Sequence, residues 1–330
     1  LLHSGGRCVI LFKQERNPFP MEKNNQFRTS IGGQALIEGI LMRGPEKQAI
    51  VVRSPEGLVT RVEELTLVKD KYPILGWPII RGAVTFLDSM VRGVKALMFS
   101  ADYYPEDENV QPSKLDKWLE AHIPAEKLQS ELVWVSVLLS LGLTLLLFML
   151  LPTFIAGLFH ARHAAVHNLI EGAVKIAIFL GYMACTGMMK DIRRTYEYHG
   201  AEHKTIACYE AGEELTVENV KKHTRFHPRC GTSFIFITLI VSILVMCIVP
   251  IYQVVPRMIV SILLLPVVVG ISYEFIRIAG RSNNWLTRAL SWPGLQIQRI
   301  TTREPDASQI ECAIAALKPC IPEDMEDDKW

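Results

Sequence analysis

Two histidines and a glutamate within residues 196–210 have the spacing of a metal-binding helix. The segment reads YEYHGAEHKTIACYE, in which His199, Glu202 and His203 form an H-x-x-E-H pattern. Because residues four apart share one face of a helix, the two imidazoles could converge on one metal ion. Glu202 would lie beside them and could take a proton from a water at the metal. The pattern therefore predicts two metal ligands and a catalytic base, although Gly200 disfavours a regular helix.

More ligand-type side chains follow in the same polar connection, residues 190–230. The segment KKHTRFHPRCG places His223, His227 and Cys230 at ligand-like spacing. Imidazole and cytosolic thiolate suit zinc, so zinc or another divalent metal is expected. Four protein ligands would close the coordination and make the site structural, whereas three would leave a position open for catalysis. The predicted ligands are His199, His203, His227 and Cys230, and a glutamate remains an alternative third ligand, with Glu210, Glu213, Glu214 and Glu274 as candidates.

The overall composition excludes several classes of protein. The chain has 330 residues, with 35 Lys and Arg against 34 Asp and Glu, and this balance argues against a nucleic-acid-binding protein. Hydrophobic residues make up 49%, which excludes whole-chain disorder. The seven cysteines include no C-x-x-C pair, so a secreted disulfide framework is not expected.

Four apolar runs in the second half are long enough to cross a bilayer. Each is about 20 residues long, which matches a hydrocarbon core of about 30 Å. Pro152 is expected to end the first run, and the second could continue as one helix to Ala211. The second also carries Glu171 and Lys175 one helical turn apart, which predicts an ion pair within the bundle or, alternatively, a transport path. The predicted spans are Leu132–Leu151, Leu169–Met189, Gly231–Ile251 and Val254–Phe275.

The distribution of Lys and Arg predicts the orientation of these spans. The connection 190–230 is rich in Lys and Arg, whereas the first connection holds only Arg162 and the short connection 252–256 holds none. Basic residues also precede the first span and follow the fourth. The positive-inside rule therefore places 190–230 and both termini in the cytoplasm.

The expected fold class is a mainly α membrane protein with four transmembrane helices and a small α+β cytoplasmic N-terminal region. Residues 1–30 would be an extension, with Met21 as a plausible natural start. Residues 31–131 would form the α+β region, 132–275 the membrane region and 276–330 a cytoplasmic tail.

Local patterns predict several elements outside the spans. Two strands, Gln48–Arg53 and Leu58–Val62, flank a turn, and the glycine-rich segment Ile31–Gly44 suggests turns and close packing rather than a P-loop. Apolar residues at helical spacing over 84–98 predict an amphipathic helix that covers the sheet or lies on the membrane surface.

In the C-terminal tail, a helix from Asn284 should break at Pro293-Gly294. A second helix, Ala307–Leu317, should be capped by Asp306.

Four segments of the chain resemble the YqhQ-like family of bacterial membrane proteins. They are IGGQALIEGILMRGP, YEYHGAEHKTIACYEAGE, HPRCGTSF and LQIQRITTREP, and the resemblance covers about residues 28–318. The family has a domain of unknown function and is often described as predicted metal-dependent enzymes. The resemblance implies a bacterial plasma-membrane location and carries over His199, Glu202, His203, His227 and Cys230 as its metal-site residues.

Two functional hypotheses follow. The first is a membrane-bound metal-dependent enzyme, a hydrolase, with its His/Glu site on the cytoplasmic face. The second is a non-enzymatic membrane scaffold or assembly factor, in which the same residues form a structural metal site or a hydrogen-bonded His/Cys cluster. The expected partners are the lipid bilayer and an unspecified protein partner or second copy of the chain, without nucleic acid.

Overall fold

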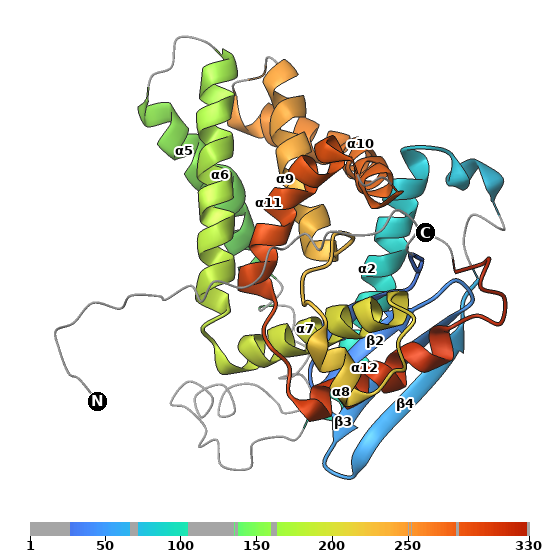
Figure 1. Ribbon diagram of the computed structural model, residues 1–330. Helices are drawn as coiled ribbons and strands as arrows, with labels where there is room; N and C mark the ends of the chain where they lie inside the picture. Colours follow the sequence, from blue (N-terminus) through green and yellow to red (C-terminus); the bar gives the residue numbers. More distant parts are fainter. Residues whose placement is uncertain are drawn as a thin grey trace, which may run out of the picture.

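The computed structural model describes residues 27–66, 72–104, 135, 138–159, 164–249, 251, 253–281 and 284–328. The predicted extension up to residue 26, all of 105–131 and most of the start of the first predicted span lie outside these residues. The described chain is mainly helical, with a four-stranded antiparallel sheet near its N-terminus (Figure 1).

Four apolar helices are long enough to cross a membrane, as predicted. The spans are Leu138–Leu158, Val166–Thr186, Gly231–Ile248 and Val255–Gly280. The first contains η2 (Leu146–Leu150) and α5 (Leu151–Leu158), and the others belong to α6 (Ala164–Thr186), α9 (Gly231–Ile248) and α10 (Val254–Arg281). The prediction that Pro152 ends the first span is wrong. A π-helical turn precedes Pro152 and places it at the start of α5, where its missing N–H is tolerated.

The predicted ion pair inside the second span is present and joins a third charge. Lys175 Nζ lies 2.6 Å from Glu171 Oε1, and Arg257 of α10 lies 3.2 Å from Glu171 Oε2. On the same helix, Asn168 donates to the Met246 carbonyl of α9. These contacts tie α6, α9 and α10 together, and they give each buried charge a partner, as a low-dielectric interior requires.

The chain turns at the end of α6 instead of continuing as one helix to Ala211. Residues 187–189 form a turn, and Met189 is an extended N-cap for a separate helix, α7 (Lys190–Glu210). Gly187 packs against the ring of Tyr196, and this contact holds the turn closed. Helix α7 ends as predicted, with Gly212 at a positive φ of 68° just beyond it.

The sheet has the order β1-β2-β3-β4, with β1 (Gly32–Leu36), β2 (Gly39–Arg43), β3 (Lys47–Ser54) and β4 (Gly57–Glu64). The two predicted strands are confirmed as β3 and β4. The glycine-rich segment Ile31–Gly44 is not a set of turns but the β1–β2 hairpin. Its glycines serve close packing, because a Cβ on Gly39 would lie 2.6 Å from the Val51 carbonyl oxygen of β3.

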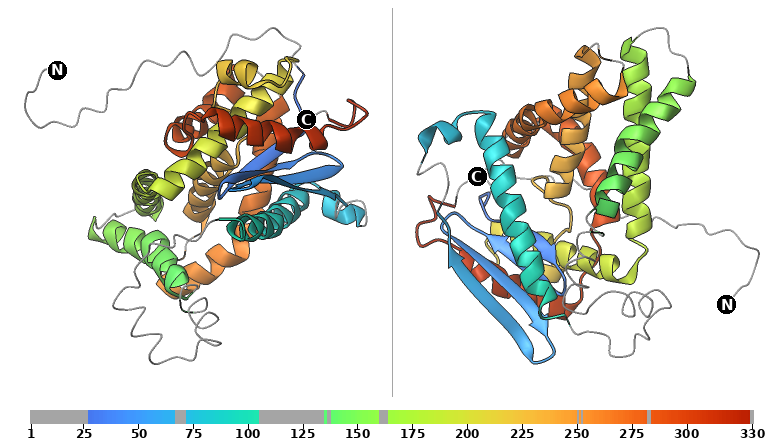
Figure 2. Two further views of the ribbon diagram at one scale, coloured as in Figure 1. Left: turned by 90° about the horizontal axis from the view of Figure 1, so that it is seen from below. Right: turned by 180° about the vertical axis from the view of Figure 1, so that it is seen from behind.

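Alternate residues of the sheet face two different helical covers. Ile40, Met42 and Val51 pack with residues of α7 and of α12 (Ala307–Leu317). Leu41, Ile50 and Val52 share a second cluster with Ala96 of α2 (Ile80–Ala101). The sheet therefore lies between α7 and α12 on one face and α2 on the other (Figure 2). The helix predicted at 84–98 is confirmed as α2, and it does cover the sheet.

Two helices in the C-terminal half of the chain end later or earlier than predicted. Helix α11 (Trp285–Thr301) continues through Pro293, because Gly294 presses directly against Ser233 in the first turn of α9. The packing of α11 against α9 therefore outweighs the tendency of Pro293-Gly294 to end a helix. For the connection 190–230, the sequence predicts a short helix that starts after Thr216 and ends at Pro228. Helix α8 (Val217–Lys222) does begin after the Thr216 cap but ends at Lys222. The predicted Asp306 cap of α12 is confirmed as a capping box with Gln309.

Candidate metal centre

Helix α7 carries the H-x-x-E-H motif across the end of the bundle, between α12 and the start of α9 (Figure 1). The regular helix places Glu202 and His203 one turn after His199, on the same face. The chain returns to this helix through the loop after α8 and reaches Cys230, the N-cap of α9. The candidate centre therefore lies where the α7 face meets the first residue of a candidate span.

Three of the predicted ligands converge. One ligand atom each from His199, His203 and Cys230 lies within 4.8 Å of the other two. His199 Nε2 is 3.1 Å from Cys230 Sγ, and the two imidazole centroids are 4.4 Å apart. Bonds of about 2.0–2.3 Å to one zinc ion would bring such atoms to within about 4 Å of each other. The donor atoms are thus close to the arrangement that a single ion requires.

Backbone carbonyls orient both imidazoles. His199 Nδ1 is 2.9 Å from the Thr301 carbonyl oxygen, and His203 Nδ1 is 2.6 Å from the Arg225 carbonyl oxygen. A carbonyl can only accept, so each Nδ1 carries a proton, and each Nε2 is the atom at which a metal would bind. Among the described residues, His203 Nε2 is buried without a hydrogen-bond partner. Such an atom is what a bound cation would satisfy.

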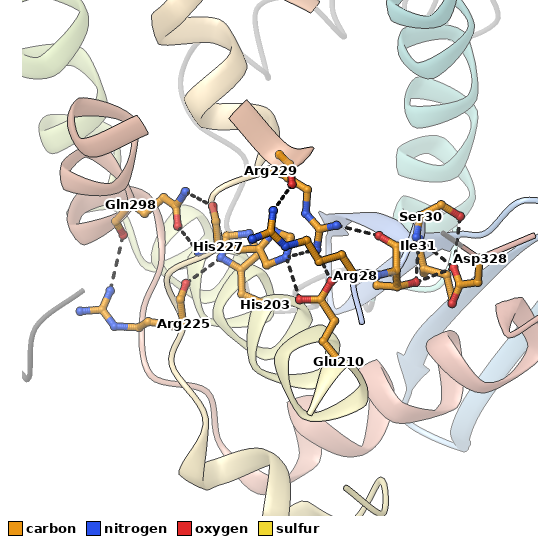
Figure 3. Close-up of polar contacts among 12 residues, drawn as sticks. Arg28, Ser30, Ile31, His203, Glu210, Arg225, His227, Arg229, Gln298 and Asp328 are labelled. Carbon is orange, nitrogen blue, oxygen red and sulfur yellow. Dashed lines mark hydrogen bonds and ion pairs between the residues drawn. The ribbon is translucent and has the colours of Figure 1, made fainter. Parts of the chain in front are cut away.

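Side chains of α11 hold the loop that supplies the Arg225 carbonyl (Figure 3). Gln298 accepts from the His227 amide at 2.8 Å and donates to the His227 carbonyl at 2.7 Å. The Arg225 guanidinium donates to the Thr302 carbonyl at 2.7 Å. These bonds fix the loop from both sides, and the loop in turn fixes the ring of His203.

The fourth predicted ligand, His227, lies beside the group and faces another partner. Its ring centroid is 5.5 Å from that of His203. Its Nε2 lies 3.1 Å from an Arg229 nitrogen and 3.9 Å from Glu210, which forms an ion pair with Arg229. Burial, aided by the Arg229 charge, lowers the pKa of His227 to about 4. This histidine is therefore neutral at pH 7 and accepts a hydrogen bond from Arg229.

Glu202 is 5% exposed and lies next to both motif histidines. Its carboxylate accepts a hydrogen bond from the Gly33 amide of β1, and a Cβ on Gly33 would come within 2.9 Å of it. Burial raises the pKa of Glu202, since the charged form loses its hydration. A raised pKa makes this carboxylate a stronger base than an ordinary glutamate.

Cys230 and His199 stabilise each other as a charged pair. Burial opposes ionisation of both groups. For His199 the Cys230 thiolate outweighs burial and raises the pKa to about 9. For Cys230 the charge of His199 is the largest effect that opposes burial, and the pKa of the thiol lies well below its usual range. The thiolate is the form that binds metal.

Three of the four alternative glutamate ligands are engaged elsewhere among the described residues. Glu274 forms an ion pair with Arg81 of α2, and Glu210 pairs with Arg229. Glu213 lies 3.3 Å from His223, and together with Cys208 these two form a separate group of ligand-type atoms. Neither His223 nor these glutamates joins the group of His199, His203 and Cys230.

The supporting groups Gly33, Arg225 and Thr301 were not predicted as part of the site. Two of them act through main-chain oxygens, which every residue type possesses, so no side-chain pattern could identify them. Gly33 and Thr301 do lie in the segments IGGQALIEGILMRGP and LQIQRITTREP, which carried the family resemblance.

Comparison with known proteins places the chain among proteins without an assigned activity. A family model described as "Protein of unknown function (DUF1385)" matches residues 77–323. The chain is 35% identical over 304 residues to "Uncharacterized protein YqhQ" of Bacillus subtilis (strain 168), with 88% of this chain and 92% of that protein covered. No solved structure matches the chain.

Proposed function

The chain belongs to the DUF1385 family, and from that premise we propose that it is a membrane-bound metal-dependent enzyme, a hydrolase, with its site at the cytoplasmic end of the helical bundle. One observation carries the proposal: His199, His203 and Cys230 converge while backbone carbonyls hold both Nδ1 atoms. The basic connection that contains the site and the bacterial relative support a plasma-membrane location with both termini in the cytoplasm.

The donor set favours zinc. Two imidazole nitrogens and one thiolate are borderline and soft donors, which suit zinc better than magnesium or calcium. Their outer partners are of the kind that usually orients zinc-binding histidines. The ion would be held by His199, His203 and Cys230, while His227 supports the loop beside it.

Three protein ligands leave one tetrahedral position open. Zinc in that arrangement supplies a Lewis acid that polarises substrate and lowers the pKa of water. Glu202 would hold the proton removed from the attacking water, since its pKa is raised and it adjoins both histidines. The Gly33 amide positions its carboxylate.

Metal analysis with a conservative variant tests this proposal. The protein is purified without chelators, and its metal content is compared with that of His199→Ala/His203→Ala and Glu202→Gln. We expect about one zinc per chain in the wild type and in Glu202→Gln, with loss in the double variant. Hydrolysis of a panel of chromogenic esters, amides and phosphoesters should be present only in the wild type. A wild-type protein without metal would overturn the proposal.

One contact favours a second candidate, a non-enzymatic scaffold with a hydrogen-bonded His/Cys cluster. The 3.1 Å contact between His199 Nε2 and Cys230 Sγ satisfies both groups without an ion. In such a scaffold, Glu202→Gln should leave the protein's cellular role intact, whereas an enzyme should lose it. Complementation of a gene-deletion strain by Glu202→Gln distinguishes the two.

A further inference from the structure

We propose that helix α2 presents one apolar face to the lipid bilayer, at the boundary of the membrane on the side of the sheet, and that lipid covers this face. This face of α2 is separate from the metal centre. Three features of the helix favour lipid as its cover: its exposed side chains, its position against α10, and the hydrogen bonding of the segment 72–80 that precedes it.

One side of α2 is apolar, and no other described part of the chain covers it. Five large hydrophobic residues, each at least 51% exposed, recur at helical spacing: Leu87, Met90, Val91, Val94 and Met98. The opposite side is used by the protein, since Gly93 and Ala96 are buried over the sheet. Acidic and basic residues occupy a separate flank, where Asp88 pairs with Arg92 and Arg43. The helix therefore has three faces. One packs against the sheet, one is charged, and the third is an apolar stripe that the described residues leave mostly exposed.

The start of α2 lies at the depth of a candidate span. Arg81 forms an ion pair with Glu274, and a Cβ on Gly82 would lie 2.6 Å from Cβ of Tyr273. Glu274 and Tyr273 belong to the span Val255–Gly280. From this contact α2 runs toward the sheet (Figure 2, right view). Its apolar stripe thus begins beside a helix that crosses the membrane.

Phe86 gives a second marker of depth. Its ring lies 5.6 Å from that of Phe234, in the first turn of the candidate span α9. The apolar stripe, which starts at the next residue, is therefore near the boundary of the hydrocarbon on the side of the sheet. An apolar stripe at that level contacts the boundary between lipid headgroups and acyl chains.

The segment 72–80, which precedes α2, is compatible with a lipid environment. The segment 72–80 reads YPILGWPII and holds no charged residue, and Ile74 and Trp77 are more than 60% exposed. Irregular backbone at membrane depth must satisfy its polar groups internally. Pro73 and Pro78 have no N–H, and the Ile79 amide donates to Glu274 Oε1 at 3.3 Å. An exposed tryptophan here is typical of a membrane interface.

Continuity with the spans selects the bilayer over other occupants. Helix α10, which contacts the start of α2, carries further exposed apolar residues, such as Ile271 and Ile278. In water, the combined surface would be a large apolar patch that promotes association. A second copy of the chain or another protein would have to displace lipid from α10 as well, so these occupants become the contrary outcomes of the test.

Site-specific photocrosslinking in native membranes tests the proposal. A benzophenone-bearing residue replaces Leu87 or Val94 in the full-length chain, and irradiated products are analysed by mass spectrometry. Leu263, 70% exposed within the span of α10, is the lipid-facing reference. Lys95, exposed on the charged flank, is the matched control on the same helix. We expect Leu87 and Val94 to give adducts heavier by one lipid molecule, as Leu263 does, and Lys95 to give none.

Other products would overturn the assignment. A crosslinked dimer at Leu87 and Val94 would identify a second copy of the chain as the occupant, and a mixed product would identify another protein. If Leu87 and Val94, like Lys95, gave no lipid adduct, water would be shown to cover the stripe. Leu263 adducts in each preparation confirm that the protein is inserted, so a failed insertion cannot imitate a negative result.

Discussion

Two main-chain carbonyls and one glycine amide control the orientation of the side chains at the candidate centre. Thr301 and Arg225 hold the two imidazoles, and Gly33 holds Glu202. That His199, Glu202 and His203 share one helix face could be predicted from the sequence, because H-x-x-E-H has a physical meaning on a helix. Which of the four predicted ligands converge could not be predicted, because His227 is turned aside by Arg229, a residue only two positions away.

The difference between His203 and His227 is directly measurable. Because His203 Nε2 is buried and unpaired among the described residues, His203→Ala should reduce bound metal to nearly none. His227→Ala should retain about one ion per chain, since its Nε2 is occupied by Arg229. Elemental analysis of both variants, with circular dichroism to check folding, decides between three and four ligands. Equal metal loss in the two folded variants would indicate a closed four-ligand site and favour a structural role.

At the scale of elements, the glycine inside the motif has a packing role that sequence reasoning did not identify. Gly200 reduces the intrinsic stability of α7, as expected from its helix propensity. It also allows segment 301–305 to cross the helix, since a Cβ on Gly200 would lie 1.9 Å from the Arg303 carbonyl oxygen. The Arg303 amide donates to the Tyr196 carbonyl at 2.8 Å, so this crossing places Thr301 over His199.

Gly200→Ala should therefore destabilise the protein although alanine is the better helix former. Propensity alone predicts a gain of about 1 kcal/mol in the free energy of unfolding. The overlap with the Arg303 carbonyl should instead produce a net loss of about 1–3 kcal/mol and weaken metal binding. Thermal unfolding in detergent measures the first effect and metal titration the second. Gly181→Ala in α6 is the matched control, because nothing lies within 4 Å of a Cβ there. A stabilised Gly200→Ala variant with normal metal affinity would refute the packing role.

The elements that sequence reasoning identified correctly are those with a strong local signal. Long apolar runs gave the four spans, and Asp306 gave the start of α12. The errors occurred where distant packing decided the outcome. The β1–β2 hairpin was hidden by glycines that serve close strand packing, and α11 passes Pro293 because it presses on α9. Neither the strand packing nor the contact between α11 and α9 produces a periodic pattern of residues in the sequence.

At the scale of the whole molecule, three segments separated by pairs of spans assemble into one layer. The sheet precedes the first span, α7 and α8 lie between the second and third, and α12 follows the fourth. Residues of all three pack in one core, which includes Met42, Tyr198 and Ile310. Segments in contact must lie on the same side of the membrane, so an even number of crossings must separate each from the next. The four candidate spans meet this condition.

The same condition, combined with the positive-inside rule, predicts the topology in the cell. The layer of the sheet, α7 and α12 should lie in the cytoplasm, because the connection 190–230 carries most of the basic residues between spans. A reporter enzyme that folds only outside the cytoplasm should be active when fused after Phe159 and inactive when fused after Gly212. A cytoplasmic fluorescent reporter should give the opposite result at the same two positions. Activity of the first reporter at Gly212 would place the metal centre outside the cytoplasm, where thiols oxidise readily, and a reduced Cys230 ligand would then be difficult to maintain. The topology measurement therefore also tests whether a thiolate-based metal site is chemically reasonable for this protein.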